Sequence, residues 1–549
     1  MNLLIDISGF LGVILEGFAR AAQCVTLGSV AFIFLLAVPL RPALGTVGDA
    51  ILARARRIGF IAAFILLASL AAGLAIHVVI LAGTLEISLG AAVGDDFSRA
   101  TLVRIAAAAL VLALIGRGPE PSRFLPALVL LDLVAGVATS HAAAQIEHRA
   151  ALAAVTAAHH LAAGLWIGGL PAFLAALGLI ADDAQRRRVG KRYSAIALAA
   201  VAGIALSGTG LVVAFVGSPA AAYGTAYGQM LGAKVTLFAG LLLLGGMNFL
   251  AVEHLSRRPA YLAVRLRRFV EVELGIGLSM IFIAASMTSL PPAIDLVEGR
   301  ASLAEIAERL HPHWPRLTSP GKDSLAFYEL QQKLDAEAQA KARPAAEAYV
   351  PGSGIPLPRN AEDIAWSEYN HHIAGVIVLA IGLLALLERS GWMPWARHWP
   401  LLFVVLAWFL FVRSEAEGWP FGRLSLAESL RDPEFVQHKV FMALIVGFAG
   451  FEWSVRIGWL TRAWARYVFP LLCAIGGMML LTHSHSLANV KELLLIEMTH
   501  IPLAVFGIWA GWTRWLELRM EGRVATICGW AWPILFSLVG LLLLTYREI

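Results

Sequence analysis

Histidine is the residue type whose placement in this sequence points most directly to chemistry. Ten histidines lie in or beside long apolar stretches, where a histidine is energetically costly and usually serves a function. Imidazole is also a common protein ligand for copper, zinc, iron and nickel ions. The candidate metal ligands are His77, His141, His159, His160, His371, His372, His438, His483, His485 and His500. We therefore predict metal sites built from imidazole.

Two parts of the chain concentrate these histidines in a similar order. The first runs from Ser140 to Leu170 and reads SHAAAQIEHRAALAAVTAAHHLAAGLWIGGL. The second begins with the THSH sequence at 482–485 and continues to His500. In both, a Ser-His or Thr-His is followed by a short break, an apolar segment with histidine, and Trp-x-Gly. Because the spacings differ, we predict similar sites in the two halves rather than a demonstrated duplication.

The composition identifies the elements that carry these residues. The chain has 549 residues, of which 59% are hydrophobic and only 15% are charged, whereas soluble globular proteins carry about 25% charged residues. A polytopic membrane protein fits this composition. The net charge of +5 is what basic loops on one side of a membrane give, so we expect no nucleic-acid binding. The sequence contains no CxxC motif, no nucleotide-binding motif and no pattern typical of a cleaved signal peptide.

Fourteen apolar segments are candidates to span a bilayer, which takes about 20 residues. The predicted fold is therefore an all-α polytopic membrane protein with about 14 transmembrane helices in an 8 + 6 arrangement. The segments lie at approximately 14–40, 58–83, 100–116, 122–142, 151–181, 193–217, 228–254, 268–290, 370–389, 399–413, 435–456, 466–482, 492–516 and 524–545.

The distribution of basic residues predicts the orientation of these segments. Arginine and lysine collect in alternate loops, for example at 186–192 and 257–268, and such loops face the cytoplasm. Both termini and the long polar break are then periplasmic, in a bacterial inner membrane. We predict an eight-helix domain at 1–290, a periplasmic loop at 291–369 and a six-helix, histidine-rich domain at 370–549.

This orientation assigns each histidine to one side of the membrane and leaves one carboxylate, Asp132, inside it. Of the fifteen histidines, only His254 and His398 fall on the inner side, so the predicted metal sites face outward. Asp132 lies in the middle of the fourth segment and needs a cationic partner, for which Arg104 and Arg20 are the candidates. The sequence leaves open whether this pair is structural or serves ion passage.

Three stretches carry a family likeness. HHLAAGLWIGGLPAFL, GQMLGAKVTLFAGLLLLGGMNF and LRRFVEVELGIGLSMIFIAASMTSLPPA resemble the CopD family of bacterial inner-membrane copper-resistance proteins. The resemblance covers about residues 14–293, and the six-helix extension is not part of the family core. The positions that match the family pattern are His160, Trp166, Gly168, Gly169, Lys234 and Glu273.

The resemblance implies a role in copper binding or copper movement at the inner membrane, in resistance or supply. It also implies a periplasmic CopC-like copper carrier as a partner. On this hypothesis outward-facing histidines capture copper, and the bundle either passes it inward or hands it on at the periplasmic face. The sequence does not decide whether the chain is an enzyme, and no catalytic residue is assigned.

Two alternatives remain open from the residues alone. Histidines on neighbouring helices at equal depth are able to ligate a b-type haem, and His77 with His159 or His160 is one candidate pair. His438 or His483 with His500 is another, and such a cytochrome would exchange electrons with a periplasmic c-type cytochrome. The second alternative is a metal-dependent membrane oxidoreductase that uses the histidines of the six-helix half as one cluster.

Overall fold

The computed structural model describes residues 2–145, 147–311, 313–341, 359–481 and 490–548. Across these residues the regular structure is helical and no strand is formed. Apolar segments of this length favour helices because a backbone inside a bilayer must satisfy its own hydrogen bonds. The predicted all-α, polytopic membrane architecture is confirmed.

The chain forms two compact units. The N-terminal unit comprises Leu11–Ala222 and Met230–Val297. The C-terminal unit comprises Met1–Phe10, Tyr223–Gln229 and Glu298–Ile549. The short segment Tyr223–Gln229 belongs to the C-terminal unit, where the Ala301 amide donates to the Gly224 carbonyl at 3.1 Å.

The first part of the chain folds into long helices with short helical turns between some of them. In chain order these elements are α1 (Asn2–Phe32), the π-helical η1 (Ile33–Ala37), α2 (Val38–Leu44), α3 (Thr46–Leu85), α4 (Leu89–Val93), α5 (Asp96–Ile115), α6 (Leu125–Val137), α7 (His141–Ala144), α8 (Arg149–Ala163), the π-helical η2 (Gly164–Gly168), α9 (Leu170–Leu179), α10 (Asp183–Phe215), α11 (Pro219–Gly224), α12 (Ala226–Glu253) and α13 (Pro259–Met287).

The rest of the chain is also helical where it is described. These elements are α14 (Leu303–Leu310), the 3₁₀-helical η3 (Lys322–Ser324), α15 (Ala326–Ala340), α16 (Ala361–Ser390), η4 (Pro394–His398), α17 (Leu401–Arg413), α18 (Leu426–Ser429), α19 (Pro433–Arg456), η5 (Ala465–Tyr467), α20 (Val468–Leu480), α21 (Val490–Arg519) and α22 (Gly522–Leu544).

Every one of the fourteen predicted segments coincides with an apolar helix. Among the described residues, eleven helices are long and apolar enough to cross a membrane. Three shorter apolar helices, Leu125–Val137, Leu401–Arg413 and Ala465–Leu480, fall on the predicted fourth, tenth and twelfth segments. The predicted count of 14 transmembrane helices therefore requires that these three shorter helices also cross the membrane, and it stays a prediction.

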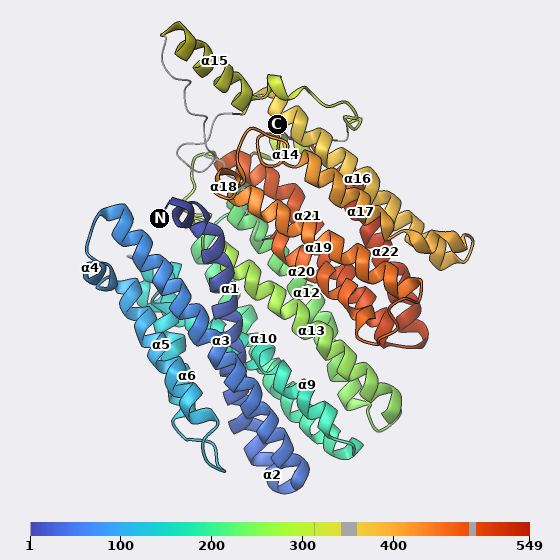
Figure 1. The fold of residues 1–549 in the computed structure, drawn as a ribbon. Helices are drawn as coiled ribbons and strands as arrows, with labels where there is room; N and C mark the ends of the chain where they lie inside the picture. The colour runs from blue at the N-terminus through green and yellow to red at the C-terminus, as the bar shows by residue number, and fades with distance from the viewer. Residues whose placement is uncertain (1, 146, 312, 342–358, 482–489, 549) are drawn as a thin grey trace. The chain divides into compact units, whose positions relative to one another are not determined.

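In the C-terminal unit six helices close into a ring. Each of α16, α17, α19, α20, α21 and α22 packs on the next, and α22 returns to pack along α16 (Figure 1). Large aromatic rings, among them Trp399, Phe403 and Phe469, fill the interior. Glycines bring α16 and α22 together: a Cβ placed on Gly375 would lie only 2.5 Å from the Leu544 amide. Small residues at a helix crossing permit this close backbone approach.

In the N-terminal unit, α3, α5 and α6 pack side by side (Figure 1). The π-helical η2 packs against α10 and α13, and its Gly168 lies directly on the backbone of α1 at Cys24. A π-helical turn inside an apolar helix changes the direction of the following side chains and is frequent at functional sites. The turn that carries Trp166 thus lies against at least three helices.

Candidate metal-handling sites

The family-pattern residues Trp166 and Glu273 meet in the interior of the N-terminal unit. The Trp166 indole Nε1 donates to Glu273 Oε1 at 2.5 Å. The side chain of Asn248 on α12 donates to the other carboxylate oxygen at 2.6 Å. Glu273 and Trp166 are both almost fully buried, at 3% and 2% exposure. One donor on each oxygen fixes the carboxylate and connects η2, α12 and α13, because a buried charge must be hydrogen-bonded.

The two glycines of the Trp-x-Gly-Gly motif serve close packing. A Cβ on Gly168 would overlap the Cys24 carbonyl of α1, and one on Gly169 would lie 3.0 Å from the Tyr193 hydroxyl. That hydroxyl donates to the Trp166 carbonyl at 2.5 Å. The motif therefore holds the tryptophan turn in place, and larger residues would displace it.

His159 and His160 lie near the end of α8, just before this turn. His159 Nδ1 donates to the Ser207 hydroxyl at 3.1 Å, whose own proton goes to the Gly203 carbonyl at 2.6 Å. The rings of His159 and His160 are 6.3 Å apart. Lys234 of α12 acts electrostatically on both. The family-pattern lysine and histidine therefore belong to one charged neighbourhood.

His77 and His141 contact other residues than His159 and His160. His77 Nε2 lies 3.0 Å from the carboxylate of Asp95, and its ring packs 4.5 Å from Phe97. The ring of His141 lies 6.3 Å from the Phe215 ring, and its buried Nε2 has no hydrogen-bond partner among the described residues. The structure thus gives His77 a carboxylate partner, and no contact joins it to His159 or His160.

The buried Asp132 lies against Arg104. Arg104 Nε is 3.3 Å from one oxygen of Asp132, and Gln23 donates to the other oxygen at 2.8 Å. Arg20, the other candidate partner, pairs with Glu16 at 2.6 Å. The pair joins α5 to α6, and Gln23 adds α1, as expected for an intramembrane charge satisfied within the bundle.

In the C-terminal unit, the end of the bundle where α16 begins gathers His371, His500 and Tyr546; we refer to it as the histidine end. The rings of His371 and His500 are 5.8 Å apart, with an angle of 87° between their planes. Tyr546 stacks on His371 at 3.9 Å. The position of His371 along α16 is set by a capping box, in which Asn360 and Asp363 exchange hydrogen bonds of 2.9 Å.

His372, the neighbour of His371, is held by backbone groups on both ring nitrogens. Its Nδ1 accepts from the Arg316 amide at 2.7 Å, and its Nε2 donates to the Tyr546 carbonyl at 2.6 Å. In this arrangement neither nitrogen is directed to an ion. Of the two adjacent histidines, His372 ties chain segments together, and His371 faces His500.

His438 is surrounded by an acidic group that we define as Glu415, Glu417, Asp432 and Glu434. His438 Nδ1 lies 2.5 Å from Glu415 Oε1. Burial first, and then the charges of Glu415 and Asp432, raise the pKa of Glu417 to about 8. Asp432 caps α19 through the Glu434 amide at 2.9 Å. The carboxylates of the acidic group therefore disfavour one another's charged form, and His438 pairs with one of them, Glu415.

Where the structure describes them, the predicted ligands do not form a complete coordination site. Within the described ranges, no group of three or more His, Cys, Asp or Glu side chains is arranged to hold a metal ion. His483 and His485 lie outside the described residues. The structure therefore brings together His159 with His160 and His371 with His500, while His77 and His438 each pair with a carboxylate.

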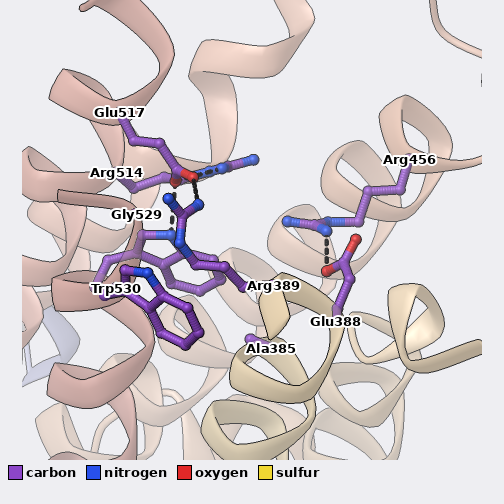
Figure 2. Close-up of a pocket in the computed structure, with 9 residues that line it drawn as sticks. Ala385, Glu388, Arg389, Arg456, Arg514, Glu517, Gly529 and Trp530 are labelled. Carbon is purple, nitrogen blue, oxygen red and sulfur yellow. Dashed lines mark hydrogen bonds and ion pairs between the residues drawn. The ribbon is translucent and has the colours of Figure 1, made fainter. Parts of the chain in front are cut away.

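The opposite end of the C-terminal bundle carries a network of three arginines, which we call the arginine end. Arg389, Arg456 and Arg514 line a cavity of about 440 Å³ together with glutamates and tryptophans. In Figure 2 Arg389 points to Glu517, and Arg456 points to Glu388. Glu452 connects Arg456 at 2.7 Å with Arg514 at 3.1 Å.

Each arginine of this network also lies over an indole ring. The guanidinium carbons are 4.7 to 5.5 Å from the ring centres of Trp399, Trp530 and Trp532. Cation–π contacts of this kind and alternating ion pairs join α16, α19, α21 and α22 at one end. The arginine end is therefore a cross-link between helices that carry the histidine end.

Several of these residues were not identified from the sequence. Glu388, Glu452 and Glu517 each lie within four residues of a basic residue at the end of an apolar segment, which is a signal for an ion network. The acidic group is visible as two short acidic runs around residues 415 and 432. Tyr546 follows the last helix, and no local pattern marks it, because its role depends on the closure of α22 onto α16.

The fold and these sites define a class before any comparison is made: a polytopic helical membrane protein with histidine-bearing interiors in two units. Residues 187–287 match the family described as copper resistance protein D. This stretch contains most of α10, all of α12, and α13, and thus Lys234, Asn248 and Glu273. The resemblance to the CopD family is confirmed in the matched residues, and the match does not include the C-terminal bundle.

A curated relative supports the same assignment. "Copper transport protein CutJ" of Bacillus subtilis (strain 168) is 32% identical over 162 residues. The aligned part is 29% of this chain and 29% of the relative, so most of both proteins lies outside the similarity. No solved structure matches the chain.

Proposed function

We propose that this protein binds copper at the periplasmic face of a bacterial inner membrane and passes it into or across the membrane, in copper resistance or supply. The observation that carries the proposal is the family match at 187–287, because the matched helices supply the partners of the tryptophan turn. Glu273 accepts hydrogen bonds from Trp166 and Asn248, and Lys234 acts electrostatically on the histidines of α8. The N-terminal unit is the proposed copper-handling core.

The placement of the histidines supports an approach of copper from one side. His159 and His160 on α8, and His371 and His500 at the histidine end of the C-terminal bundle, all belong to segment halves that the basic-loop pattern predicts to be periplasmic. A periplasmic CopC-like carrier is the partner we propose on this side. Both termini and the 291–369 loop are proposed to be periplasmic as well.

The haem and oxidoreductase alternatives gain no support. Neither the family match nor the relative points to haem or to a redox reaction. His77 is bonded to Asp95 and makes no contact with the proposed partner histidines. Copper handling is therefore the function that the described residues favour.

The test is the copper content of cells that express the full chain. We expect expression to change total cell copper relative to cells with an empty vector, with zinc unchanged, when both metals are counted by elemental analysis. His160→Gln should abolish the change at an equal membrane level of the protein. His254→Gln is the matched control, because His254 is half-buried just after the end of α12, and its Nδ1 lies 2.9 Å from the Leu250 carbonyl of that helix.

Equal copper in expressing and control cells would contradict the proposal. So would a His160→Gln variant that changes cell copper as strongly as the unmodified chain does.

A further inference from the structure

The ion pairs of the arginine end form one series of alternating charges. In order along the series, its members are Arg389, Glu517, Arg514, Glu452, Arg456 and Glu388. Each inner member lies between two opposite charges. Among the described residues, Arg389 and Glu388 at the two ends have one ion-pair partner each. The series therefore ends in a cation and an anion that are compensated from one side only.

These two end groups are consecutive residues of α16, and both line the cavity of about 440 Å³ at this end. Figure 2 shows their side chains diverging, Arg389 toward Glu517 and Glu388 toward Arg456. Each of the two side chains is 25% exposed, more than any other member of the series. The cavity thus offers a ligand one accessible cation and one accessible anion.

Glu388 keeps one carboxylate oxygen for a ligand. Its Oε2 accepts hydrogen bonds from Arg456 and from the Trp399 indole, the latter at 3.0 Å. Among the described residues, no hydrogen bond reaches Oε1. A carboxylate oxygen binds a charged donor more strongly than a neutral one, so an ammonium group is the matching partner.

Arg389 keeps N–H groups for a ligand and is held in a fixed position. Its Nη1 donates to Glu517 and its Nη2 donates to the Thr526 carbonyl, the latter at 3.2 Å, and each of these nitrogens carries a second N–H. The guanidinium lies 5.5 Å from the centre of the Trp530 ring and against Gly529, where a Cβ would overlap it. A guanidinium held in this way is suited to binding phosphate.

Tryptophans indicate that this cavity lies at the level of the lipid headgroups, where tryptophan is enriched in membrane proteins. Exposed tryptophans occupy the chain connections at the same end, namely Trp392, Trp395, Trp459 and Trp464. Trp530 lines the cavity and is exposed as well. The phosphate and ammonium groups nearest to the cavity are therefore those of lipids.

An apolar stripe on α22 continues from the cavity along the bundle. It begins at Trp530 and includes Ile534, Leu538 and Leu541, all of them exposed. Residues at this spacing lie on one face of a helix. A lipid with its headgroup in the cavity has this stripe beside its acyl chain, which a free phosphate would not use.

The charges also select among lipid headgroups. The series contains three arginines and three glutamates, so its net charge is zero. An anionic headgroup would add an uncompensated charge to this partly buried network, whereas a zwitterionic headgroup adds none. We propose that the arginine end binds the headgroup of an aminophospholipid, with its phosphate on Arg389 and its ammonium group on Glu388.

The test is a lipid titration of the delipidated full-length protein in detergent, followed by native mass spectrometry. Phosphatidylethanolamine is compared with phosphatidylcholine, which is zwitterionic without an ammonium N–H, and with phosphatidylglycerol, which is anionic without an amine. The first molecule of phosphatidylethanolamine should bind at least about tenfold more tightly than either, as expected from one charge-assisted hydrogen bond. Phosphoethanolamine, the headgroup without acyl chains, should not displace this lipid at an equal concentration.

Two substitutions separate the two charges. Glu388→Gln keeps an oxygen for the present hydrogen bonds but removes the anion, and it should abolish the preference for phosphatidylethanolamine over phosphatidylglycerol. Arg389→Gln should weaken the binding of phosphatidylethanolamine by at least about tenfold. Arg397→Gln and Glu521→Gln are the matched controls, because both residues are exposed at the same end and do not line the cavity. Neither control should change the affinity or the preference.

Equal affinity for the three lipids would overturn the inference, and so would tightest binding of phosphatidylglycerol. Displacement by phosphoethanolamine at an equal concentration would also overturn it, because the site would then take a soluble headgroup. An unchanged preference in Glu388→Gln would do the same, and this variant keeps the test open if Arg389→Gln fails to fold. No copper enters these measurements, so the inference and the proposed function fail separately.

Discussion

The carboxylate of Glu273 shows how single residues shape the N-terminal unit. It receives one hydrogen bond from Trp166 and one from Asn248, in an interior where an unsatisfied carboxylate is costly. The sequence marks Trp166 and Glu273 through the family pattern. It does not predict that they bond to each other, because they lie 107 residues apart and meet only through the π-helical turn.

Trp166→Phe should destabilise the protein by about 1–3 kcal/mol, because it leaves Glu273 Oε1 buried without a donor. The measurement is the free energy of unfolding in detergent. Trp408→Phe is the matched control, since Trp408 is 63% exposed, and it should be nearly neutral. Equal effects of the two substitutions would show that the hydrogen bond contributes nothing.

The raised pKa of Glu417 predicts that the free energy of unfolding depends on pH. Its raised pKa of about 8 lies above the ordinary value of 4.5. The folded protein therefore binds more protons at this group than the unfolded chain does between about pH 4.5 and pH 8. The free energy of unfolding then falls as the pH rises through that window.

Glu417→Gln should remove this contribution, so that the variant gains stability relative to the unmodified protein as the pH is raised from 5 to 8.5. Thermal unfolding followed by tryptophan fluorescence at several pH values provides the measurement. A difference between the two proteins that does not change with pH would contradict the assignment.

At the scale of helices, hydrophobicity and basic loops are sufficient to predict where the apolar helices lie. All fourteen predicted segments are helical, although α3 begins at Thr46, twelve residues before its predicted start, because no proline separates its basic first turns from its apolar part. The π-helical turn at Gly164–Gly168 and the contact of α22 with α16 were not predicted. Both depend on tertiary packing at glycines, which local patterns do not encode.

Gly540→Ala should destabilise the C-terminal bundle by about 1–3 kcal/mol through overpacking, because a Cβ there would overlap the Leu379 backbone of α16. Gly450→Ala on α19 is the control, since nothing lies within 4 Å of its Cβ position. The control should be neutral or stabilising by up to about 1 kcal/mol, from the higher helix propensity of alanine. The same sign for both would argue against close packing of α16 and α22.

At the scale of the whole molecule, the histidines are divided between two compact units. The sequence predicts histidine sites in both halves, and the structure places His159 beside His160 in one unit and His371 beside His500 in the other. It could not be predicted that His372 is bound on both nitrogens by backbone groups. Such partners are set by the tertiary fold and leave no trace in residue spacing.

Because the two histidine pairs belong to separate units, His160→Ala should remove copper from the N-terminal unit and leave the C-terminal unit filled. His500→Gln should do the reverse. Elemental analysis of the purified variants provides the count. Loss of all copper from either variant would mean that the two units share one site.

The most direct test of copper handling is a metal count and an absorption spectrum on the same purified sample. The protein is loaded with Cu(I), washed with a weak chelator, and analysed for copper and iron. A spectrum is then recorded as the dithionite-reduced minus oxidised difference. We predict retained copper, no stoichiometric iron and no Soret band. Iron at about one per unit with a Soret band and a b-type α-band, and no retained copper, would contradict the account and make the protein a cytochrome.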